Sequence, residues 1–430
     1  MTDQHKLEEF AEDLAGENSL GSHSWKMERI EDVCVINPSS INDGFGYDEM
    51  KYLNISSTGK GYIQEYQHHN IDDAPSRAKR TVEAGDSVIS TVRPGREQYV
   101  YMSDPDENVV VSTGFVVLRP KNTNELDSRF LYYAVTRPEL IRYFESNATG
   151  SAYPAVNLSV VRDGKIPIPP IDKQKKIANA LSNLDEKIAI NNRISETLED
   201  FIRTIFKSWF VDFDPYNEFK DSRNRRVPIN FEVEDLTAIA NVTYGYGFNS
   251  DDFNEEKKGY PVIRNGDLPN PTIEYETSKY IDKNIDSKYE VSPGDLVVTM
   301  DRYFDPYLWK GKTAALNQRI CKFEGRSEEF SNILLYNLIR NPINKIEQAK
   351  TGTTLPHLGK SDIDNIEVVV PDSGSLSRFN NMALPMYEKI VNLSKENRNL
   401  ANLRDILLPK LMSCEVRLNP VINNNSMSDN

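Results

Sequence analysis

The chain has 430 residues, too many for one ordinary hydrophobic core, so two or more domains are expected. Its net charge of −14 excludes a uniformly basic nucleic-acid-binding surface. No apolar run approaches the length of a membrane span, and nothing resembles a signal peptide. The three cysteines (Cys34, Cys321 and Cys414) are far apart in sequence and form no metal-type pair. A reduced cytoplasmic protein is therefore predicted.

In chain order, residues 1–24 form a polar acidic tail and residues 25–170 a first region of short strands, turns and helices. This region contains a Gly-Asp turn that enters an apolar strand (EAGDSVIST, 83–91) and a strand-like run ending at Pro120. Residues 128–146 show a helical pattern that Pro138 interrupts. The alternation of strand and helix patterns predicts a mixed domain.

A long helix is predicted over 171–210, because apolar residues recur there at steps of four and three, as in a heptad repeat. Residues 211–225 follow as a linker whose basic run favours a flexible, solvated segment over a specific contact. A second mixed region covers 226–372, a second helix covers 373–413, and a tail covers 414–430. Pro385 should kink the second helix or delay its start. The seam residues expected to pair the helices are Ile177, Leu181, Leu184, Ile188, Leu198, Ile202, Ile390, Leu393, Asn397, Leu400, Leu403 and Leu407.

The two halves repeat one another. EAGDSVIST (83–91) matches SPGDLVVTM (292–300), and TGSAYPAVNLS (149–159) matches TGTTLPHLGKS (351–361) at an offset of 202. The helical segments NRISETLEDFI (192–202) and NRNLANLRDIL (397–407) match at an offset of 205. IPIP (166–169) also matches VVVP (368–371) at the offset of 202. Four ordered matches at nearly one spacing indicate a duplicated plan.

Two seams in one chain favour an intramolecular antiparallel pair. The predicted fold is therefore α+β, with two mixed α/β domains joined by two long helices that form an antiparallel coiled coil. A helix of about 40 residues spans roughly 60 Å. The plainer alternative is a helical hairpin that only dimerises the protein. For Asn397, tuning the helix register is favoured over binding a ligand.

The stretch DEKIAINNRISETLEDFIRTIFKSWFVDFDP (185–215) resembles the central conserved helix of Type I restriction-modification specificity subunits. LRDILLPKLMSCEVRL (403–418) is similar to their C-terminal conserved segment, and the TGSAYP and TGTTLPHL motifs resemble the signature near the end of each recognition domain. STVRP (90–94), STGF (112–115) and LNQRI (316–320) resemble recurrent strings of the family. The resemblance covers about residues 25–418.

That resemblance implies that each mixed region is a target-recognition domain that reads one half of a split site in double-stranded DNA. It implies that the paired helices set the spacer and dock two methyltransferase subunits, and that restriction subunits with motor and nuclease activity join this core. The chain would then be non-catalytic by itself, a subunit of a complex for site-specific DNA restriction and adenine methylation.

The residues themselves show no convincing catalytic constellation. The Asn/Asp-Pro-Pro-aromatic string of an adenine methyltransferase and the phosphate-binding loop of an ATPase are both absent from the sequence. His68-His69 lacks a third ligand nearby, so a solvated pair is favoured over a metal site. Asp212 and Asp214 favour a turn or docking role over acid-base work. No cofactor and no metal are expected.

Candidate DNA contacts fall in two pairs of loops that combine basic, aromatic and hydroxyl side chains. For each loop, an ordinary surface turn or turn cap is an equally good interpretation. The candidates are Arg93, Arg96, Thr149, Gly150, Ser151 and Tyr153 in the first half, and Arg302, Tyr303, Lys310, Lys312, Thr351, Gly352, Thr353 and His357 in the second.

Two other functions stay open. A helical scaffold that assembles proteins and touches no DNA would suit the acidic composition, although the recognition-domain motifs oppose it. A free-standing enzyme would have only the acid pair of Asp212 and Asp214 behind it.

Overall fold

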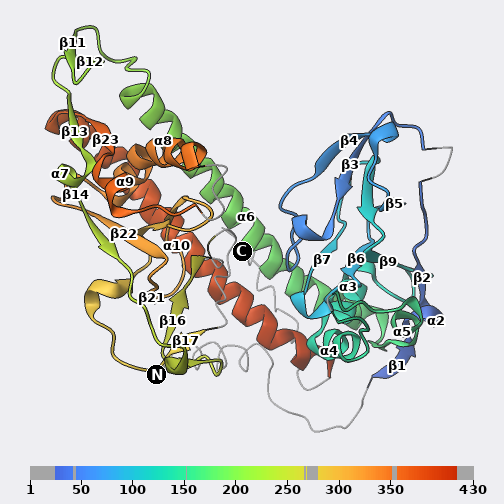
Figure 1. Cartoon of the computed structure of the whole chain (residues 1–430). Helices are drawn as coiled ribbons and strands as arrows, with labels where there is room; N and C mark the ends of the chain where they lie inside the picture. Colours follow the sequence, from blue (N-terminus) through green and yellow to red (C-terminus); the bar gives the residue numbers. More distant parts are fainter. Residues whose placement is uncertain are drawn as a thin grey trace, which may run out of the picture. The chain divides into compact units, whose positions relative to one another are not determined.

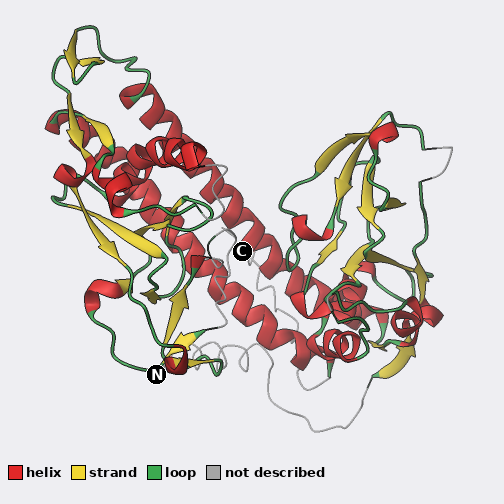
Figure 2. Cartoon of the chain, viewed as in Figure 1, coloured by secondary structure: helices red, strands yellow, loops and turns green. Residues whose placement is uncertain are grey.

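The computed structural model describes residues 25–41, 45–151, 153–265, 268, 279–350 and 356–413. The chain divides into two compact units: the first unit comprises residues 1–186 and 401–430, and the second comprises residues 187–400. Each unit mixes helices and strands (Figure 2). None of the helices in the described part of the chain combines the length and apolar character that a membrane crossing requires.

The first unit contains two four-stranded sheets and one two-stranded sheet, ordered β2-β9-β6-β7, β4-β3-β8-β5 and β1-β10. All strand pairs are antiparallel except β3 with β8. Helices α2 to α5 gather at the β1 end of this unit, and β3, β4 and β5 lie at its other end (Figure 1). The elements are β1 (Lys26–Arg29), α2 (Ile30–Val33), β2 (Cys34–Ile36), β3 (Glu49–Leu53), η1 (Ile55–Ser57), β4 (Gln67–Asn70), η2 (Ile71–Asp73), β5 (Ala78–Thr81), β6 (Ser87–Ser90), η3 (Pro94–Arg96), β7 (Tyr99–Tyr101), β8 (Val109–Ser112), β9 (Phe115–Pro120), α3 (Ser128–Thr136), α4 (Pro138–Ser146), α5 (Leu158–Asp163) and β10 (Lys165–Ile168).

The second unit contains sheets ordered β14-β22-β19-β20, β15-β17-β16-β21-β18, β13-β23 and β11-β12. Its elements are β11 (Phe219–Ser222), β12 (Arg225–Pro228), β13 (Glu232–Asp235), α7 (Leu236–Ile239), β14 (Ala240–Tyr244), η4 (Ser250–Asp252), β15 (Phe253–Asn254), β16 (Tyr260–Ile263), β17 (Tyr280–Ile281), η6 (Ser287–Tyr289), β18 (Glu290–Val291), β19 (Leu296–Thr299), β20 (Pro306–Leu308), β21 (Ala314–Leu316), β22 (Ile320–Gly325), α8 (Asn332–Lys350), α9 (Lys360–Asp364) and β23 (Glu367–Val370).

The two units share one topology. The order β2-β9-β6-β7 corresponds to β14-β22-β19-β20, and β1-β10 corresponds to β13-β23. The parallel pair β3 with β8 corresponds to the parallel pair β16 with β21. The sequence repeat is therefore a repeat of supersecondary structure.

The repeated Gly-Asp motif is a turn that enters the central strand. Gly85 and Gly294 have φ values of +94° and +100°, which glycine adopts without steric cost. In the first unit the carboxylate of Asp86 accepts from the backbone N–H of Glu83 (2.9 Å) and from Arg119 (2.7 and 2.9 Å). In the second unit Asp295 accepts from the backbone N–H of Ser292 (2.8 Å), and burial raises the pKa of its carboxyl. The motif is conserved between the halves because it builds the turn.

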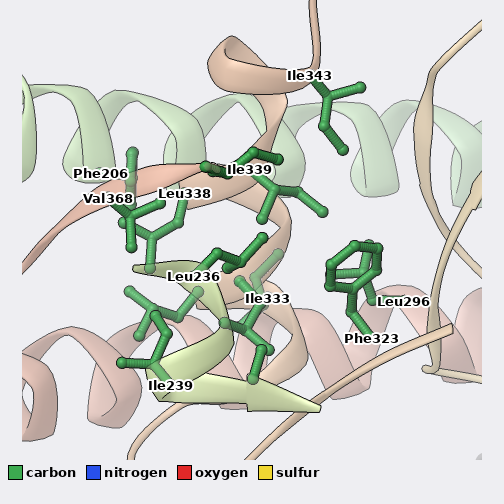
Figure 3. Packing of buried hydrophobic residues seen from close by; sticks show 14 of the residues in the cluster. Phe206, Leu236, Ile239, Leu296, Phe323, Ile333, Leu338, Ile339, Ile343 and Val368 are labelled. Atoms are coloured by element: carbon green, nitrogen blue, oxygen red, sulfur yellow. The ribbon is translucent and has the colours of Figure 1, made fainter. Parts of the chain in front are cut away.

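The central four-stranded sheet of each unit is buried on both faces, which explains its nearly continuous apolar runs. Along β6, Ile89 faces the helices of the first unit, whereas Val88 faces β3 and β8. In the second unit Leu296 and Phe323 belong to one buried cluster that also includes residues of α7, α8 and α6 (Ile171–Phe210) (Figure 3). Alternate residues of each strand thus serve two cores.

Two long helices run through both units: α6 (Ile171–Phe210) and α10 (Ser373–Met412). Pro170 and Pro371 precede them, as expected for residues that restrict the preceding backbone. Pro385 lies inside α10, so the prediction that it could delay the helix start is wrong. Within the second unit the helices are antiparallel, because Asn191 bonds Asn397 while Phe206 packs on Phe379.

The predicted seam residues are largely removed from solvent in their units. In the first unit Ile177, Leu181, Leu403 and Leu407 are buried and Leu184 is half-buried; in the second, Ile202, Ile390, Leu393 and Asn397 are buried, and Ile188, Leu198 and Leu400 are half-buried. The predicted α+β fold with two mixed domains and two long antiparallel helices is confirmed.

The basic run after α6 is folded rather than an unstructured, solvated linker. Lys220, Arg223, Arg225 and Arg226 lie on the hairpin of β11 and β12 or in its turn. Three of them pair with carboxylates: Lys220 with Glu232, Arg223 with Asp235 and Glu367, and Arg225 with Glu367. The guanidinium of Arg226 lies 5.0 Å from the centre of the Phe219 ring. The run therefore ties the hairpin to β13 and β23.

Candidate nucleic-acid interface

In the first unit, backbone hydrogen bonds bring two predicted loops together. Thr149 and Ala155 exchange N–H···O bonds of 2.9 Å, which closes the TGSAYP segment into a tight loop. The N–H of Arg93 donates to the carbonyl of Pro154 (2.7 Å), and the N–H of Val156 donates to the carbonyl of Thr91 (2.8 Å). The loop that carries Arg93 and Arg96 is thereby fixed beside Thr149, Gly150, Ser151 and Tyr153.

The side chains of this surface suit contact with DNA. Tyr153 is 71% exposed, and the Arg93 guanidinium lies 4.7 Å from the centre of its ring. Arg96, Gly150 and Ser151 are exposed. Gly150 has a φ of +108°, and a Cβ there would lie 3.2 Å from the Tyr153 carbonyl oxygen, so the loop geometry requires glycine. The arrangement can offer a cation, an aromatic face and hydroxyl groups on one surface.

The second unit builds the equivalent contact. The N–H of Arg302 donates to the carbonyl of Pro356 (3.1 Å), and the N–H of Leu358 donates to the carbonyl of Met300 (2.7 Å). Arg93 and Arg302 both have left-handed backbone conformations, with φ of 50° and 67°. Such conformations are uncommon outside glycine and tend to occur at functional sites. The predicted residues Thr351, Gly352 and Thr353 lie outside the described residues.

The five predicted residues of the second unit that lie in the described ranges divide into two groups. Arg302 and Tyr303 follow β19, and His357 lies beside them through a bridge between Asp301 and His357. Lys310 and Lys312 follow β20 at the opposite end of the β19–β20 hairpin, where the N–H of Gly294 donates to the Trp309 carbonyl (2.7 Å). Lys310 pairs with Glu199 on α6, while Lys312 is exposed. The structure therefore does not bring these two lysines together with Arg302.

The sequence reasoning missed a charged cluster beside Arg302. The carboxylate of Asp301 lies 2.5 Å from Arg319 Nη1 and 2.6 Å from His357 Nδ1. Arg319 belongs to the string LNQRI, so its position in a recurrent string was the available signal. Its partners come from positions far apart in the sequence, which only the fold brings together.

The residues considered for other chemistry have local partners. Asp212 pairs with Lys207, and Asp214 accepts from Ser208 Oγ (2.8 Å), so both carboxylates bond the last turn of α6. His68 and His69 lie on β4, where the His69 ring packs edge-on against Tyr52. Within the described ranges, no three His, Cys, Asp or Glu side chains gather closely enough to hold a metal ion.

Comparisons with known proteins agree with this architecture. The family model for the Type I restriction modification DNA specificity domain matches residues 23–200 and 228–375, one stretch in each half. The Type I restriction enzyme HindI specificity subunit of Haemophilus influenzae is 23% identical over 91% of this chain and 99% of its own length. The MjaIX specificity subunit of Methanocaldococcus jannaschii is 28% identical over 74% of this chain and 75% of its own.

Among solved structures, the Type-I restriction-modification system S subunit from M. genitalium covers 92% of this chain and 98% of its own, at 15% identity and a TM-score of 0.49. The two family-model matches together span most of the chain, and each includes a complete set of the repeated strands. The chain therefore belongs to the Type I restriction-modification DNA specificity family and is a specificity subunit of such a system.

Proposed function

We propose that each unit recognises one half of a split DNA site, through the surface at the end of its central hairpin. The duplicated topology is the observation that carries this proposal, because two copies of one domain provide two equivalent surfaces. In the first unit the surface consists of Arg93, Arg96, Thr149, Gly150, Ser151 and Tyr153. In the second unit it includes Arg302, Tyr303 and His357, and we extend it to Thr351, Gly352 and Thr353 by the sequence repeat.

The paired helices then set the length of the spacer. Each helix has 40 residues, and at 1.5 Å per residue its length is roughly 60 Å. Half-sites one helical turn apart are separated by roughly 34–36 Å, which a rod of that length can bridge. The same duplication gives two related helical surfaces, so we propose that two methyltransferase subunits dock there and that restriction subunits complete the complex.

An exchange of residues 25–170 for the same region of a relative with a different target tests the modular proposal. The exchanged chain, combined with its methyltransferase partner, should methylate a sequence in which only one half-site has changed. Sequencing of the methylated DNA measures this. A change in both half-sites, or in neither, would refute the assignment of one unit to each half.

The acidity of the chain favours the alternative of a protein scaffold that does not touch DNA. Replacement of Arg93 and Arg302 by glutamate distinguishes the two functions. Each lost phosphate contact reduces the slope of log affinity against log salt concentration by about one. Arg203 on α6 is a matched control, since it is an exposed arginine paired with Asp200 at 2.7 Å. An unchanged salt slope for the Arg93 and Arg302 variants would favour the scaffold.

A further inference from the structure

Asp301 is the centre of a polar cluster on the second unit. Its carboxylate takes hydrogen bonds from Arg319 and His357, at 2.5 and 2.6 Å. Its backbone carbonyl accepts from the Asn265 amide (2.6 Å) and from the N–H of Tyr303 (2.8 Å). Asn265, Arg319 and His357 come from three other segments of the chain and hold this residue in place, together with the local N–H of Tyr303.

The two partners of the carboxylate are more exposed to solvent than the carboxylate itself. The side chains of Arg319 and His357 are 55% and 52% exposed, and that of Asp301 is 22% exposed. Arg302 and Tyr303, with Tyr303 55% exposed, follow Asp301 directly. The cluster therefore belongs to the surface that we assign to DNA in the second unit.

The first unit has no such cluster at the equivalent positions. The bridge between Asp301 and His357 corresponds to the bridge between Val92 and Ala155. The pairing of Val298 with Cys321 corresponds to that of Ile89 with Val116, which aligns Arg319 with Gly114. The first unit thus has Val92, Ala155 and Gly114 where the second unit has Asp301, His357 and Arg319, although the two units share the same topology.

The charges favour contact with a base over contact with a phosphate. A carboxylate next to a guanidinium cancels much of the positive field that would attract a phosphate. It also fixes the plane of the guanidinium, while most of the five N–H donors stay available. An arginine held in this way can donate two parallel hydrogen bonds to O6 and N7 of guanine in the major groove.

We propose that Arg319 reads a guanine in the half-site of the second unit, and that Asp301 and His357 are the residues that hold Arg319 and complete this contact. This inference rests on the proposed function, since it assumes that the second unit reads one half-site. It adds a residue outside the predicted set of DNA contacts and names the base that this residue reads.

The test uses the full chain in complex with its methyltransferase, once its target has been found by sequencing methylated DNA. Arg319→Lys keeps the charge and loses the planar fork. Duplexes in which each position of the site is substituted singly are then methylated. The variant should lose roughly 5- to 150-fold of its discrimination at one guanine of one half-site and keep the other half-site unchanged. Asp301→Asn should reduce discrimination at the same position.

Arg223→Lys is the matched control, because Arg223 also lies 2.5 Å from an aspartate and belongs to the second unit, away from the β19–β22 loops. It should leave the site unchanged, and thermal unfolding should show that all three variants are folded. If Arg319→Lys keeps full discrimination, or weakens all sequences equally, the inference is wrong. If the unaltered complex methylates no split sequence, the proposed function fails as well, so the two failures are distinct.

Discussion

The buried asparagine pair between the long helices gives a quantitative prediction about the second unit. Asn191 and Asn397 are 0% and 2% exposed. Asn191 Nδ2 donates to Asn397 Oδ1 (2.8 Å) and to Glu396 Oε2 (2.9 Å), and Asn397 Nδ2 donates to Asn192 Oδ1 (2.8 Å). Asn397→Ala removes two of these three bonds.

The expected cost follows from those contacts. A neutral hydrogen bond contributes about 1 kcal/mol to stability, so Asn397→Ala should destabilise the second unit by about 2 kcal/mol. For a unit of this size, that corresponds to a fall in Tm of roughly 4–8 °C. Replacing both asparagines by leucine should leave the stability near or above that of the unaltered chain, because an apolar pair needs no polar partner.

Differential scanning calorimetry of the full chain measures these effects, with the transition of the second unit followed separately. Asn399→Ala is the matched control, since Asn399 is exposed on the same helix. The Asn191→Ala and Asn397→Ala changes should show a coupling energy of about 1 kcal/mol in a double-mutant cycle. Strict additivity, or a shift in Tm no larger than that of the control, would refute the role of the pair.

Three further outcomes are expected. Arg404→Met should destabilise the first unit by about 3 kcal/mol. The Arg404 side chain is only 13% exposed, and its loss leaves the carboxylate of Asp185, 2.8 Å away, without its cation. Chemical denaturation measures the free energy of unfolding, and a change below about 1 kcal/mol would contradict this expectation. Gly150→Ala should weaken DNA binding by the complex in a filter or fluorescence assay, because a φ of +108° strains any residue other than glycine. Gly46→Ala is the control, since no atom lies near the added Cβ, and it should leave the affinity unchanged. Equal affinities of the two variants would argue against a role of the Gly150 loop in DNA binding. Burial raises the pKa of the Cys34 thiol to about 12. Alkylation of Cys34 in the folded chain should therefore be slow at pH 8 and should accelerate as the pH rises toward that value. Rapid labelling of Cys34 at pH 8, measured by mass spectrometry, would contradict this.

The repeat and the long helices could be predicted because both depend on local sequence. Heptad spacing identifies a helix wherever it lies in the chain, and a Gly-Asp turn needs only its glycine and the acceptor that follows. The hairpin of β11 and β12 was missed for a local reason as well. Its turn places Arg223 and Asn224 at positive φ (44° and 62°) without the glycine that normally indicates such a turn.

The candidate interface could be predicted only in part. Arg93 and the TGSAYP loop were both singled out, and the fold places them together through the bond between Arg93 and Pro154. Lys310 was grouped with Arg302 because the two are near in sequence. A hairpin, however, separates residues at its turn from residues at its open end, so Lys310 reaches Glu199 instead.

The sequence by itself determined that this chain is one domain plan used twice, with a long helix after each copy, since periodicity and turn residues are local properties. Only the tertiary structure decided how the two copies differ at their exposed surfaces. Asp301, Arg319 and His357 are distant in sequence and meet because β19 pairs with β22 and because residue 301 bridges residue 357. Strand register depends on the packing of the whole unit. This register places the guanidinium of Arg319 at the position that Gly114 occupies in the first unit.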